Sequence, residues 1–372
     1  MTHATGPLAG LVVADFSRVL AGPYATMMLG DMGAEVIKIE RPGTGDDTRS
    51  WGPPHDSAGT ATYFNSVNRN KTSRAIDLQS ESGVAQAREI VSGADILIEN
   101  FRAGAMDRLG LGYSTLSQRN PGLIYCSITG FGTGGGAALP GYDLVVQAVG
   151  GLMSVTGPDA ETPTKVGVAM VDIVTGPHAL SGILAALHHR SNTGAGQQVH
   201  TSLMASVLSA LSNQSAAYLG AGVVPVPMGN KHPSLVPYEV FETADRPLAL
   251  AVGNDRQFQA LVEVLNEPKL SADERFSSNS ARVEHRDQLV DILNSALRAR
   301  TADEWYRELM ARNVPAGPVN SLDEAFAFAE SLGFEPRVQV PGSVADGVRN
   351  PLDFSATPVN YRLPPPDLEG QI

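Results

Sequence analysis

The sequence contains little cysteine and little positive charge. Cys126 is the single cysteine among 372 residues, which excludes an intramolecular disulfide framework and any zinc or iron–sulfur site built from several cysteines. Lys and Arg together number 27 against 39 Asp and Glu, so the net charge is −12. Nucleic acids and anionic lipid surfaces are bound by basic protein surfaces. We therefore expect neither a nucleic-acid nor a membrane partner.

The sequence also lacks the signals of several known protein classes. Residues 1–10 contain no basic segment followed by an apolar run, and no apolar run reaches the ~18 residues of a membrane span, so we expect a cytoplasmic protein. A Gly-x-x-x-x-Gly-Lys phosphate loop, a His-Glu-x-x-His zinc motif and a Gly-x-Ser-x-Gly nucleophile elbow are all missing. Neighbours such as His188 and His189 face different directions on a helix, so we predict no metal site.

Short apolar segments alternate with helical patterns in the first 130 residues. Each segment is a nearly continuous apolar run, which is typical of strands in a parallel sheet that is covered on both faces. The pattern predicts the α/β class and a Rossmann-like arrangement. The predicted strands are 11–16, 35–39, 74–78, 95–98 and 123–128, and the predicted helices are 25–32 and 81–91.

The pattern changes in the second half of the chain. Residues 173–190 and 200–219 are predicted to form two long helices, after which a Gly-, Pro- and Val-rich stretch at 221–237 indicates a domain boundary. A smaller α+β domain is then expected, with a hairpin of 238–242 and 248–252. Its predicted helices are 257–265, 286–298, 302–312 and 322–329, the last two opened by capping boxes.

A glycine-rich segment, Gly130 to Gly135, matches the Gly-x-Gly-x-x-Gly dinucleotide fingerprint after a predicted strand. That fingerprint requires the glycines to open a helix that binds pyrophosphate. Pro140 and Gly141 follow almost at once, and both are poor helix formers. We predict a loop near a site, and an NAD-dependent oxidoreductase is only a distant alternative.

Asp172 lies between an apolar run and the start of the 173–190 helix. Asp is a favoured N-cap residue, so a purely structural role is one interpretation. The other is chemical, because a carboxylate kept ionised by the backbone N–H groups and the dipole of a helix N-terminus is a usable nucleophile. The residues alone leave both interpretations open.

The sequence resembles the class III CoA-transferases, the family of formyl-CoA transferase, carnitine CoA-transferase and α-methylacyl-CoA racemase. The resemblance covers nearly the whole chain and rests on the joint order of many short motifs, of which each one is weak. The matching segments are 8–16, 21–23, 33–42, 68–71, 94–95, 99–102, 107–110, 129–132, 141–143, 166–176, 194–197, 229–230, 232–233, 237–238 and 253–255.

The resemblance implies a homodimer of two interlocked, ring-like chains. It also implies a large Rossmann-like CoA-binding domain built from both chain ends, residues 1–220 and 326–372, and a small α+β domain at 221–325. Acyl-CoA and a small carboxylic acid would be the partners as substrates, with no resident prosthetic group.

The resemblance further implies roles for individual residues. Asp172 aligns with the family nucleophile, with Tyr142 and Asp143 beside it, and the capping and catalytic roles of Asp172 can coexist. Asp172 would attack a thioester to give a mixed anhydride, and CoA thiolate would convert that anhydride to an aspartyl-CoA thioester. The implied CoA-binding residues are Val19, Leu20, Arg41, Ile76, Asn100, Phe101, Ala105 and Arg108.

Two features of the resemblance bear on the substrate. Racemases of the family have His where this chain has Tyr142, and a phenol with a pKa near 10 is a poor base at neutral pH, so transfer is favoured over epimerisation. The segment of Gly229, Asn230, Lys231 and His232 resembles members that act on dicarboxylic acids. The leading hypothesis is an acyl-CoA:carboxylate CoA-transferase. The alternatives are a 2-methylacyl-CoA epimerase and a catalytically silent CoA-binding protein.

Overall fold

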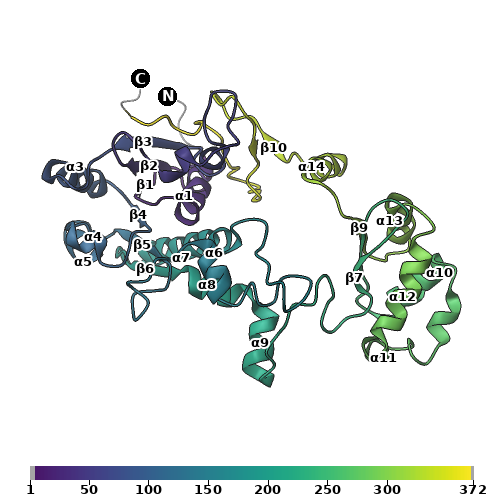
Figure 1. Ribbon diagram of the computed structural model, residues 1–372. Helices are drawn as coiled ribbons and strands as arrows, with labels where there is room; N and C mark the ends of the chain where they lie inside the picture. The colour runs from purple at the N-terminus through teal and green to yellow at the C-terminus, as the bar shows by residue number, and fades with distance from the viewer. Residues whose placement is uncertain (1–4, 370–372) are drawn as a thin grey trace. The chain divides into compact units, whose positions relative to one another are not determined.

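The structure is a computed structural model that describes residues 5–369, and its chain forms two compact units (Figure 1). Of the described residues, the first unit comprises 5–153, Lys165–Pro225 and 335–369, so it draws on both halves of the chain. The second comprises Ser154–Thr164 and Val226–Phe334. Each unit has its own hydrophobic core.

A six-stranded parallel sheet forms the centre of the first unit, in the order β3-β2-β1-β4-β5-β6. The four strands predicted at 11–16, 35–39, 95–98 and 123–128 are present, and the mixed α/β class is confirmed. The strands are β1 (Val12–Asp15), β2 (Glu35–Glu40), β3 (Lys71–Ala75), β4 (Ile96–Glu99), β5 (Ile124–Thr129) and β6 (Gln198–Ser202).

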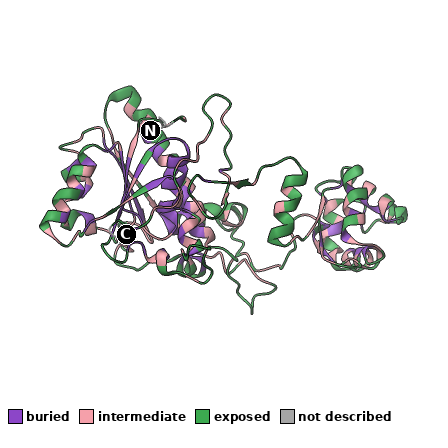
Figure 2. Cartoon of the chain, turned by 90° about the horizontal axis from the view of Figure 1, so that it is seen from above, coloured by how far each residue is buried: buried purple, intermediate pink, exposed green. Residues whose placement is uncertain are grey.

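Helices cover both faces of this sheet, as the continuous apolar strands predict (Figures 1 and 2). Alternate strand residues enter two different core clusters, because successive side chains of a strand point to opposite faces. Val13 and Ile96 pack with α1 (Ala21–Asp31), α7 (Met170–Thr193) and α8 (Leu203–Ala210). Ala14 and Leu97 pack with α3 (Glu81–Ser92), α4 (Ala105–Arg108) and α5 (Tyr113–Leu116).

The remaining elements of the first unit are short. They are η1 (Asp47–Ser50), α2 (Thr62–Asn65), α6 (Asp143–Val149), α9 (Ser212–Ala221), β10 (Arg337–Val338) and β11 (Gly347–Val348).

The prediction of one helix over 200–219 was wrong. Residues 198–202 form β6, which pairs with β5, and the rest of the segment divides into α8 and α9. Val199 is the one apolar residue among these five, so local periodicity carries no strand signal and only the pairing with β5 determines the element. The predicted strand at 74–78 likewise begins earlier, at Lys71, and α1 begins at Ala21 rather than Ala25.

One helix of the described chain, α7, is long and apolar enough to cross a membrane by length and composition alone. Core helices of water-soluble domains meet the same criterion. His, Ser and Arg residues interrupt the apolar sequence of α7, so a search for an uninterrupted apolar run does not find it. In the structure α7 packs against α1, α8, β5 and β6, which are the contacts of a core helix.

The second unit combines a small antiparallel sheet with helices. The predicted hairpin is present as β7 (Tyr238–Phe241) and β8 (Leu248–Ala251), and β9 (Ala316–Pro318) adds a third strand. Both predicted capping boxes, at Thr301 and Ser321, are formed. The helices are α10 (Asp255–Val264), η2 (Pro268–Ala272), α11 (Asn279–Glu284), α12 (Arg286–Leu297), α13 (Ala302–Ala311) and α14 (Leu322–Ser331).

Candidate active site

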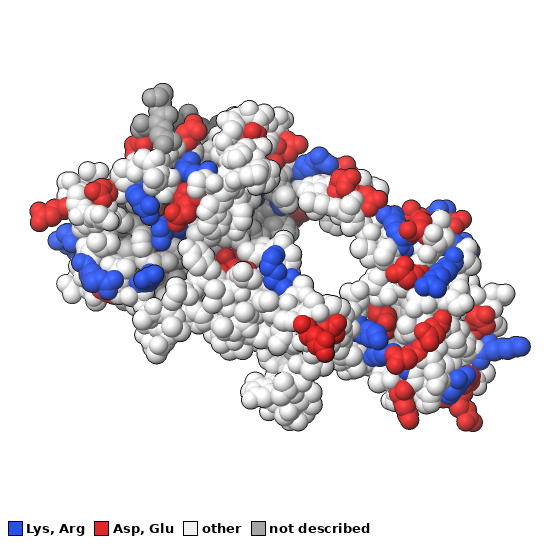
Figure 3. All heavy atoms as spheres, in the orientation of Figure 1, with Lys and Arg blue, Asp and Glu red and all other residues white. Residues whose placement is uncertain are grey.

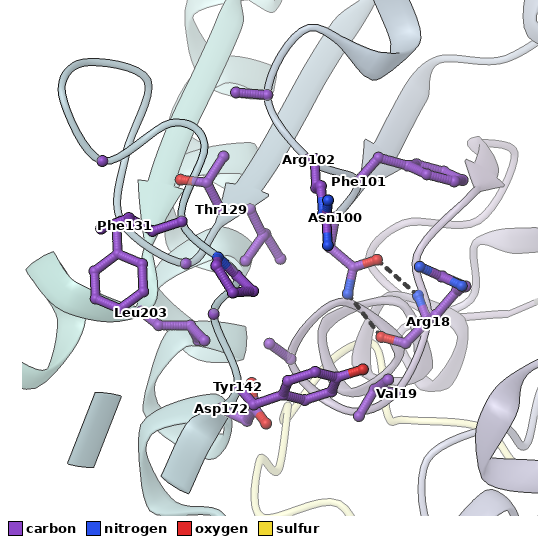
Figure 4. Close-up of a pocket in the computed structure, with 18 of the residues that line it drawn as sticks. Arg18, Val19, Asn100, Phe101, Arg102, Thr129, Phe131, Tyr142, Asp172 and Leu203 are labelled. Carbon is purple, nitrogen blue, oxygen red and sulfur yellow. Dashed lines mark hydrogen bonds between the residues drawn. The ribbon is translucent and has the colours of Figure 1, made fainter. Parts of the chain in front are cut away.

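The strand order reverses between β1 and β4, and in open α/β sheets ligands bind at such a switch point, beyond the carboxyl ends of the strands. Two residues, Arg18 and Asn100, connect the loops that follow β1 and β4 at this point. The backbone N–H of Arg18, after β1, donates to Asn100 Oδ1 at 2.9 Å, and Asn100 Nδ2, after β4, donates to the Arg18 carbonyl at 2.7 Å (Figure 4). These two hydrogen bonds hold the two loops together at the carboxyl edge of the sheet.

A pocket opens at this switch point and is lined by loops that follow β1, β4 and β5 (Figure 4). Four residues predicted to bind CoA line it, namely Val19, Leu20, Asn100 and Phe101, and so do Tyr142 and Asp172. Asp143 does not line the pocket but contacts the helix that carries Asp172. The structure therefore brings the predicted nucleophile and half of the predicted CoA-binding residues together.

The glycine-rich segment forms a wall of the same pocket. Gly130, Phe131 and Gly132 line it, and no helix begins before Asp143, so the dinucleotide fingerprint lacks its helix. The loop closes where Gly130 and Gly141 meet, because a Cβ built on Gly141 would lie 2.5 Å from the Gly130 Cα. The predicted loop near a site is thus present.

The expectation that Asp172 caps its helix was wrong. The helix α7 begins at Met170 with Ala169 as N-cap, so Asp172 lies within the first turn. The capping carboxylate is Asp143, whose Oδ1 accepts the N–H of Val171 at 2.8 Å and that of Asp172 at 3.3 Å. The N–H groups expected to keep Asp172 ionised are therefore bonded to Asp143 instead.

This arrangement changes the acidity of Asp172, which is only 9% exposed. Burial and the nearby charge of Asp143 raise the pKa of Asp172 to about 7. A carboxylate with this pKa is desolvated and more basic than a surface aspartate, and about half of it is ionised at neutral pH. Both properties suit a nucleophile that must also be released from its adduct.

A buried glutamine fixes Asp143 in turn. Gln147, one turn along α6, donates from Nε2 to Asp143 Oδ2 at 2.6 Å, and its Oε1 accepts the N–H of Val166 at 2.9 Å. The first turn of α6 is thereby linked to the segment that leads into α7. Gln147 was not among the predicted site residues, because an isolated glutamine has no motif that distinguishes it from a surface residue.

Two tyrosines lie near the carboxylate pair. Tyr142 is exposed and lines the pocket, with its ring drawn beside Asp172 in Figure 4. Burial together with the charges of Asp172 and Asp143 raises the pKa of Tyr63 to about 12, so Tyr63 stays a neutral phenol. Tyr63 comes from α2, and sequence analysis missed it, since no local pattern relates α2 to Asp172.

A second pocket adjoins the first along the edge of the sheet. Arg18 and Phe101 line both pockets, and the second also includes Arg41 after β2 and Ile76 after β3, as the resemblance implies for CoA binding. The Arg41 side chain is exposed, and no ion pair with another residue of the segment 5–369 holds it. It is therefore available to an anionic ligand.

Ala105 and Arg108 line neither pocket. They form the ends of the short helix α4, and Arg108 is exposed without an ion pair to any described residue. Arg18 and Arg102 line the first pocket but were not among the predicted site residues. Both are adjacent to predicted site residues, and their basic character in an acidic chain is a signal that could have identified them.

The residues expected to bind the acid belong to the second unit. Lys231 lies 3.8 Å from Asp287, the His232 ring packs on Tyr238 with centroids 5.0 Å apart, and the Gly229 N–H donates to the Gly157 carbonyl at 3.0 Å. Asn230 lines a hollow along β7, β8 and β9. None of the four residues lines the pocket that contains Asp172.

Within residues 5–369 no group of three or more His, Cys, Asp or Glu side chains could hold a metal ion. The fold and the pocket together define an α/β protein with a pocket at the carboxyl edge of a parallel sheet, next to a buried carboxylate, where proteins of this class bind their ligands.

Known proteins resemble the chain over nearly its whole length. The family model for CoA-transferase family III matches residues 8–371. The chain is 43% identical to a succinate–glutarate CoA-transferase of Agrobacterium fabrum over 99% of this chain and 94% of that protein. It is 39% identical to an acetyl-CoA:oxalate CoA-transferase of Acetobacter aceti, over 94% of this chain and 90% of that protein.

A solved structure also resembles this chain over nearly its whole length. The crystal structure of a CAIB/BAIF family protein from Brucella suis matches with a TM-score of 0.88 at 41% identity, covering 98% of this chain and 97% of that one. The chain belongs to CoA-transferase family III. The predicted class of enzyme, a CoA-transferase with acyl-CoA as substrate, is thereby confirmed.

Proposed function

We propose that this protein transfers CoA from a CoA thioester to a small dicarboxylic acid, with Asp172 as the carboxylate that carries CoA between them. One observation carries the assignment to this residue: Asp172 is a buried carboxylate in the pocket at the switch point, among residues that the family resemblance assigns to CoA. The relatives named above act on dicarboxylic acids, which supports that class of substrate.

The proposed reaction keeps one activated acyl bond, a thioester or an anhydride, at every step. The Asp172 carboxylate attacks the donor thioester carbonyl, which forms a mixed anhydride and releases CoA thiolate. The thiolate attacks the aspartyl carbonyl, forming a C–S bond and releasing the donor acid as a carboxylate. The acceptor carboxylate then attacks this aspartyl thioester, and the thiolate released attacks the acceptor carbonyl. The new acyl-CoA leaves, Asp172 is regenerated, and no ATP is consumed.

An exchange assay with trapping tests this mechanism. Purified protein is mixed with acyl-CoA donors and isotope-labelled dicarboxylic acids, and hydroxylamine is added to capture acyl intermediates. We expect labelled acyl-CoA as product and a hydroxamate on Asp172 in peptide mass spectrometry. Asp172→Asn removes both, while Asp159→Asn, a change at an exposed carboxylate, removes neither. Turnover that survives in Asp172→Asn would exclude the proposed carrier.

The same assay separates the alternative functions. A 2-methylacyl-CoA epimerase exchanges the α-proton, so deuterium from D₂O would enter the acyl chain without transfer of CoA. A silent CoA-binding protein would show affinity for CoA and no product with any pair of substrates.

The Gly229 to His232 segment is the proposed site for the distal carboxylate of the acid. Lys231 supports this role, since its ammonium is partly exposed and its nearest carboxylate is 3.8 Å away. We expect Lys231→Ala to raise KM for a dicarboxylic acceptor about tenfold and to leave KM for a monocarboxylic acceptor of equal length nearly unchanged. Arg256→Ala, at an exposed cation of the same unit, is the control. Equal effects on both acceptors would exclude the role.

Two further parts of the proposal concern the assembly and the location. We propose a homodimer, with the interlocked arrangement that the family resemblance implies, and a cytoplasmic location. The helix α9 supports the dimer: none of its residues is buried, Leu219 is 82% exposed, and its sequence carries no charge (Figure 3). Exposed apolar surface of this kind marks protein–protein contacts.

A further inference from the structure

The turn between β1 and α1 contains a strained residue. Val19 has φ of +69°, in the left-handed region. A β-branched residue in this region clashes with its own backbone, so the conformation persists only where the surrounding structure enforces it. Val19 and its neighbour Leu20 line the pocket that contains Asp172.

A buried ion pair enforces this conformation from one side. Lys38, on β2, donates from Nζ to the Ser17 carbonyl at 2.9 Å and to Asp46 Oδ2 at 2.9 Å. Asp46 accepts the Val19 N–H, at 3.3 Å from each carboxylate oxygen. The pair therefore binds the backbone on both sides of Arg18 and leaves the turn little freedom.

A second buried carboxylate, that of Asp15, holds the same turn through Ser17. Asp15, the last residue of β1, accepts the Ser17 N–H at 2.9 Å and also the Ser17 hydroxyl. Its other oxygen accepts the Thr26 hydroxyl at 2.6 Å, and Lys71 Nζ lies 3.2 Å away. Ser17 is thus bonded through its N–H, its hydroxyl and its carbonyl.

A contribution to folding stability does not by itself explain why these charged residues are buried here. The side chains of Lys38, Asp46 and Asp15 are almost fully buried. Removing paired charges from water costs about as much as the pairing returns, and well-packed apolar residues are often as stable. Burial would lower the pKa of Lys38, but Asp46, Asp15 and Glu40 raise it above its usual value, so the ammonium stays charged. The network does restrict the backbone of the turn to a single conformation.

We propose that Lys38 and Asp46, supported by Asp15, are positioning residues for CoA transfer, which hold the strained Val19 turn in the shape that the pocket beside Asp172 requires. The inference rests on the proposed function, because it assigns the turn a part in that reaction. None of these three residues lines that pocket. Lys38 and Asp46 line the adjoining pocket instead, but their side chains are fully buried there, so they act on the Asp172 pocket through the turn.

The positions of these residues predict whether loss of the network changes kcat or the affinity for CoA. Val19 and Leu20 line the pocket with Asp172 and not the adjoining pocket, where Arg41 and Ile76 lie among the residues expected to bind CoA. Loosening the turn displaces the reacting end of the substrate more than the nucleotide end. A displacement of about 1 Å at the reacting atoms can cost up to about a hundredfold in rate.

The test compares two buried lysines on neighbouring strands. Lys71 on β3 is about as buried as Lys38, and its ammonium donates to the Pro23 carbonyl at 3.0 Å, to Asn68 Oδ1 at 3.0 Å and to Asp15 Oδ2 at 3.2 Å. It makes no direct bond to residues 17–19, and without it Asp15 still accepts from Ser17 and Thr26. We expect Lys38→Met to lower kcat at least tenfold with CoA affinity, by calorimetry, changed less than threefold. Lys71→Met should lower kcat less than threefold. Equal losses of kcat in both variants would overturn the inference.

A double-mutant cycle with Val19→Gly tests the connection to the strain. Glycine adopts a φ of +69° without a clash, so the turn needs less support. We expect Lys38→Met to cost at least threefold less in kcat when Val19→Gly is already present. Additive effects would show that Lys38 does not act through the strained residue.

Two checks keep the outcomes distinct. If Lys38→Met gives no folded protein by circular dichroism, Asp46→Asn replaces it, since asparagine keeps an acceptor oxygen for Val19 but loses the charge. A fall of kcat with CoA affinity retained is again expected, and an unchanged kcat overturns the inference. A wild-type protein without transfer activity would contradict the proposed function, whereas an active wild type with an equally active Lys38→Met contradicts only the positioning role.

Discussion

At the scale of single residues, the site depends on which carboxylate receives the hydrogen bonds. Two aspartates meet at the start of α7, and only Asp143 receives the backbone N–H groups there. Asp172 is left buried beside a like charge, which raises its pKa to about 7. One aspartate thus serves as a helix cap while the other becomes a basic, weakly solvated carboxylate, although both have the same side chain.

The raised pKa predicts how the stability of the apo protein depends on pH. Asp172 loses its proton near pH 3.8 in the unfolded chain but near pH 7 in the folded one, so stability falls as pH rises between these values. Asparagine cannot ionise and avoids this loss. We expect Asp172→Asn to be more stable than the wild type by about 2–4 kcal/mol at pH 8, at ~1.4 kcal/mol per pKa unit. Urea titrations at pH 5 and pH 8 measure the free energy of unfolding of both proteins. A difference between variant and wild type that does not grow with pH would contradict the prediction.

Removal of the neighbouring charge should change the pH profile of the reaction. Asp143→Asn keeps an oxygen that can cap α7 but removes the charge that raises the pKa of Asp172. Tyr63, the other titratable group coupled to Asp172, stays neutral over this range. We expect kcat/KM to rise with pH through about 7 in the wild type, and through a lower pH in the variant. Rate profiles from pH 5 to pH 9 test this, and superimposable profiles would rule out the coupling.

At the scale of elements, the pocket is formed by loops that follow parallel strands. The loop from Gly130 to Gly141 leaves β5 and returns to the start of α6, where its two end glycines meet. Close approach of two backbones at this point needs glycine on both sides. This contact explains Gly130, the first glycine of the dinucleotide pattern, without a bound dinucleotide.

The close approach predicts a sharp difference between two glycines of one loop. A Cβ at Gly141 would lie 2.5 Å from the Gly130 Cα, whereas one at Gly134 would meet nothing within 4 Å. We expect Gly141→Ala to displace the loop and lower kcat roughly ten- to hundredfold, with Gly134→Ala near the wild type. Steady-state kinetics of the two variants measure the effect. Similar activity in both would mean that the loop adapts to the added methyl group.

Local patterns predicted many elements well, for identifiable reasons. The strands at 35–40 and 96–99 are rich in Val, Ile and Leu, and the capping boxes at Thr301 and Ser321 are local hydrogen-bond motifs. The errors fell where distant contacts decide. Val199 alone does not make a strand, and β6 exists because β5 pairs with it. The start of α7 was likewise misplaced by three residues because its cap, Asp143, comes from another helix.

At the scale of the whole molecule, the last part of the chain packs onto the first unit, and one buried carboxylate there receives bonds from both. Asp31, at the end of α1, accepts from Arg69, from Asn70 and from Asn350, which lies far along the chain. The N–H of Asn360 donates to the Asp31 carbonyl at 2.7 Å. The large unit is therefore completed only when the final segment is in place.

The uncharged helix α9 predicts the effect of a charge on assembly. Burial of an unpaired carboxylate in an apolar contact costs several kcal/mol. We expect Leu219→Asp to weaken the proposed dimer at least tenfold, as measured by sedimentation equilibrium. Leu322→Asp is the control, because that exposed leucine lies on α14 beside Asp323 and Glu324. Equal dissociation constants for Leu219→Asp and the wild type would contradict an interface at α9.

The sequence by itself determined the fold class and the family, and the resemblance to that family predicted Asp172 as the nucleophile. Those depend on apolar periodicity and on the order of short motifs, which are properties of the chain read in one dimension. Only the tertiary structure decided that Asp143 rather than Asp172 caps α7, that Tyr63 lies near Asp172, and that buried ions hold the Val19 turn. Hydrogen bonds, burial and like-charge repulsion join residues far apart in sequence, so they are determined only once the strands and helices have packed.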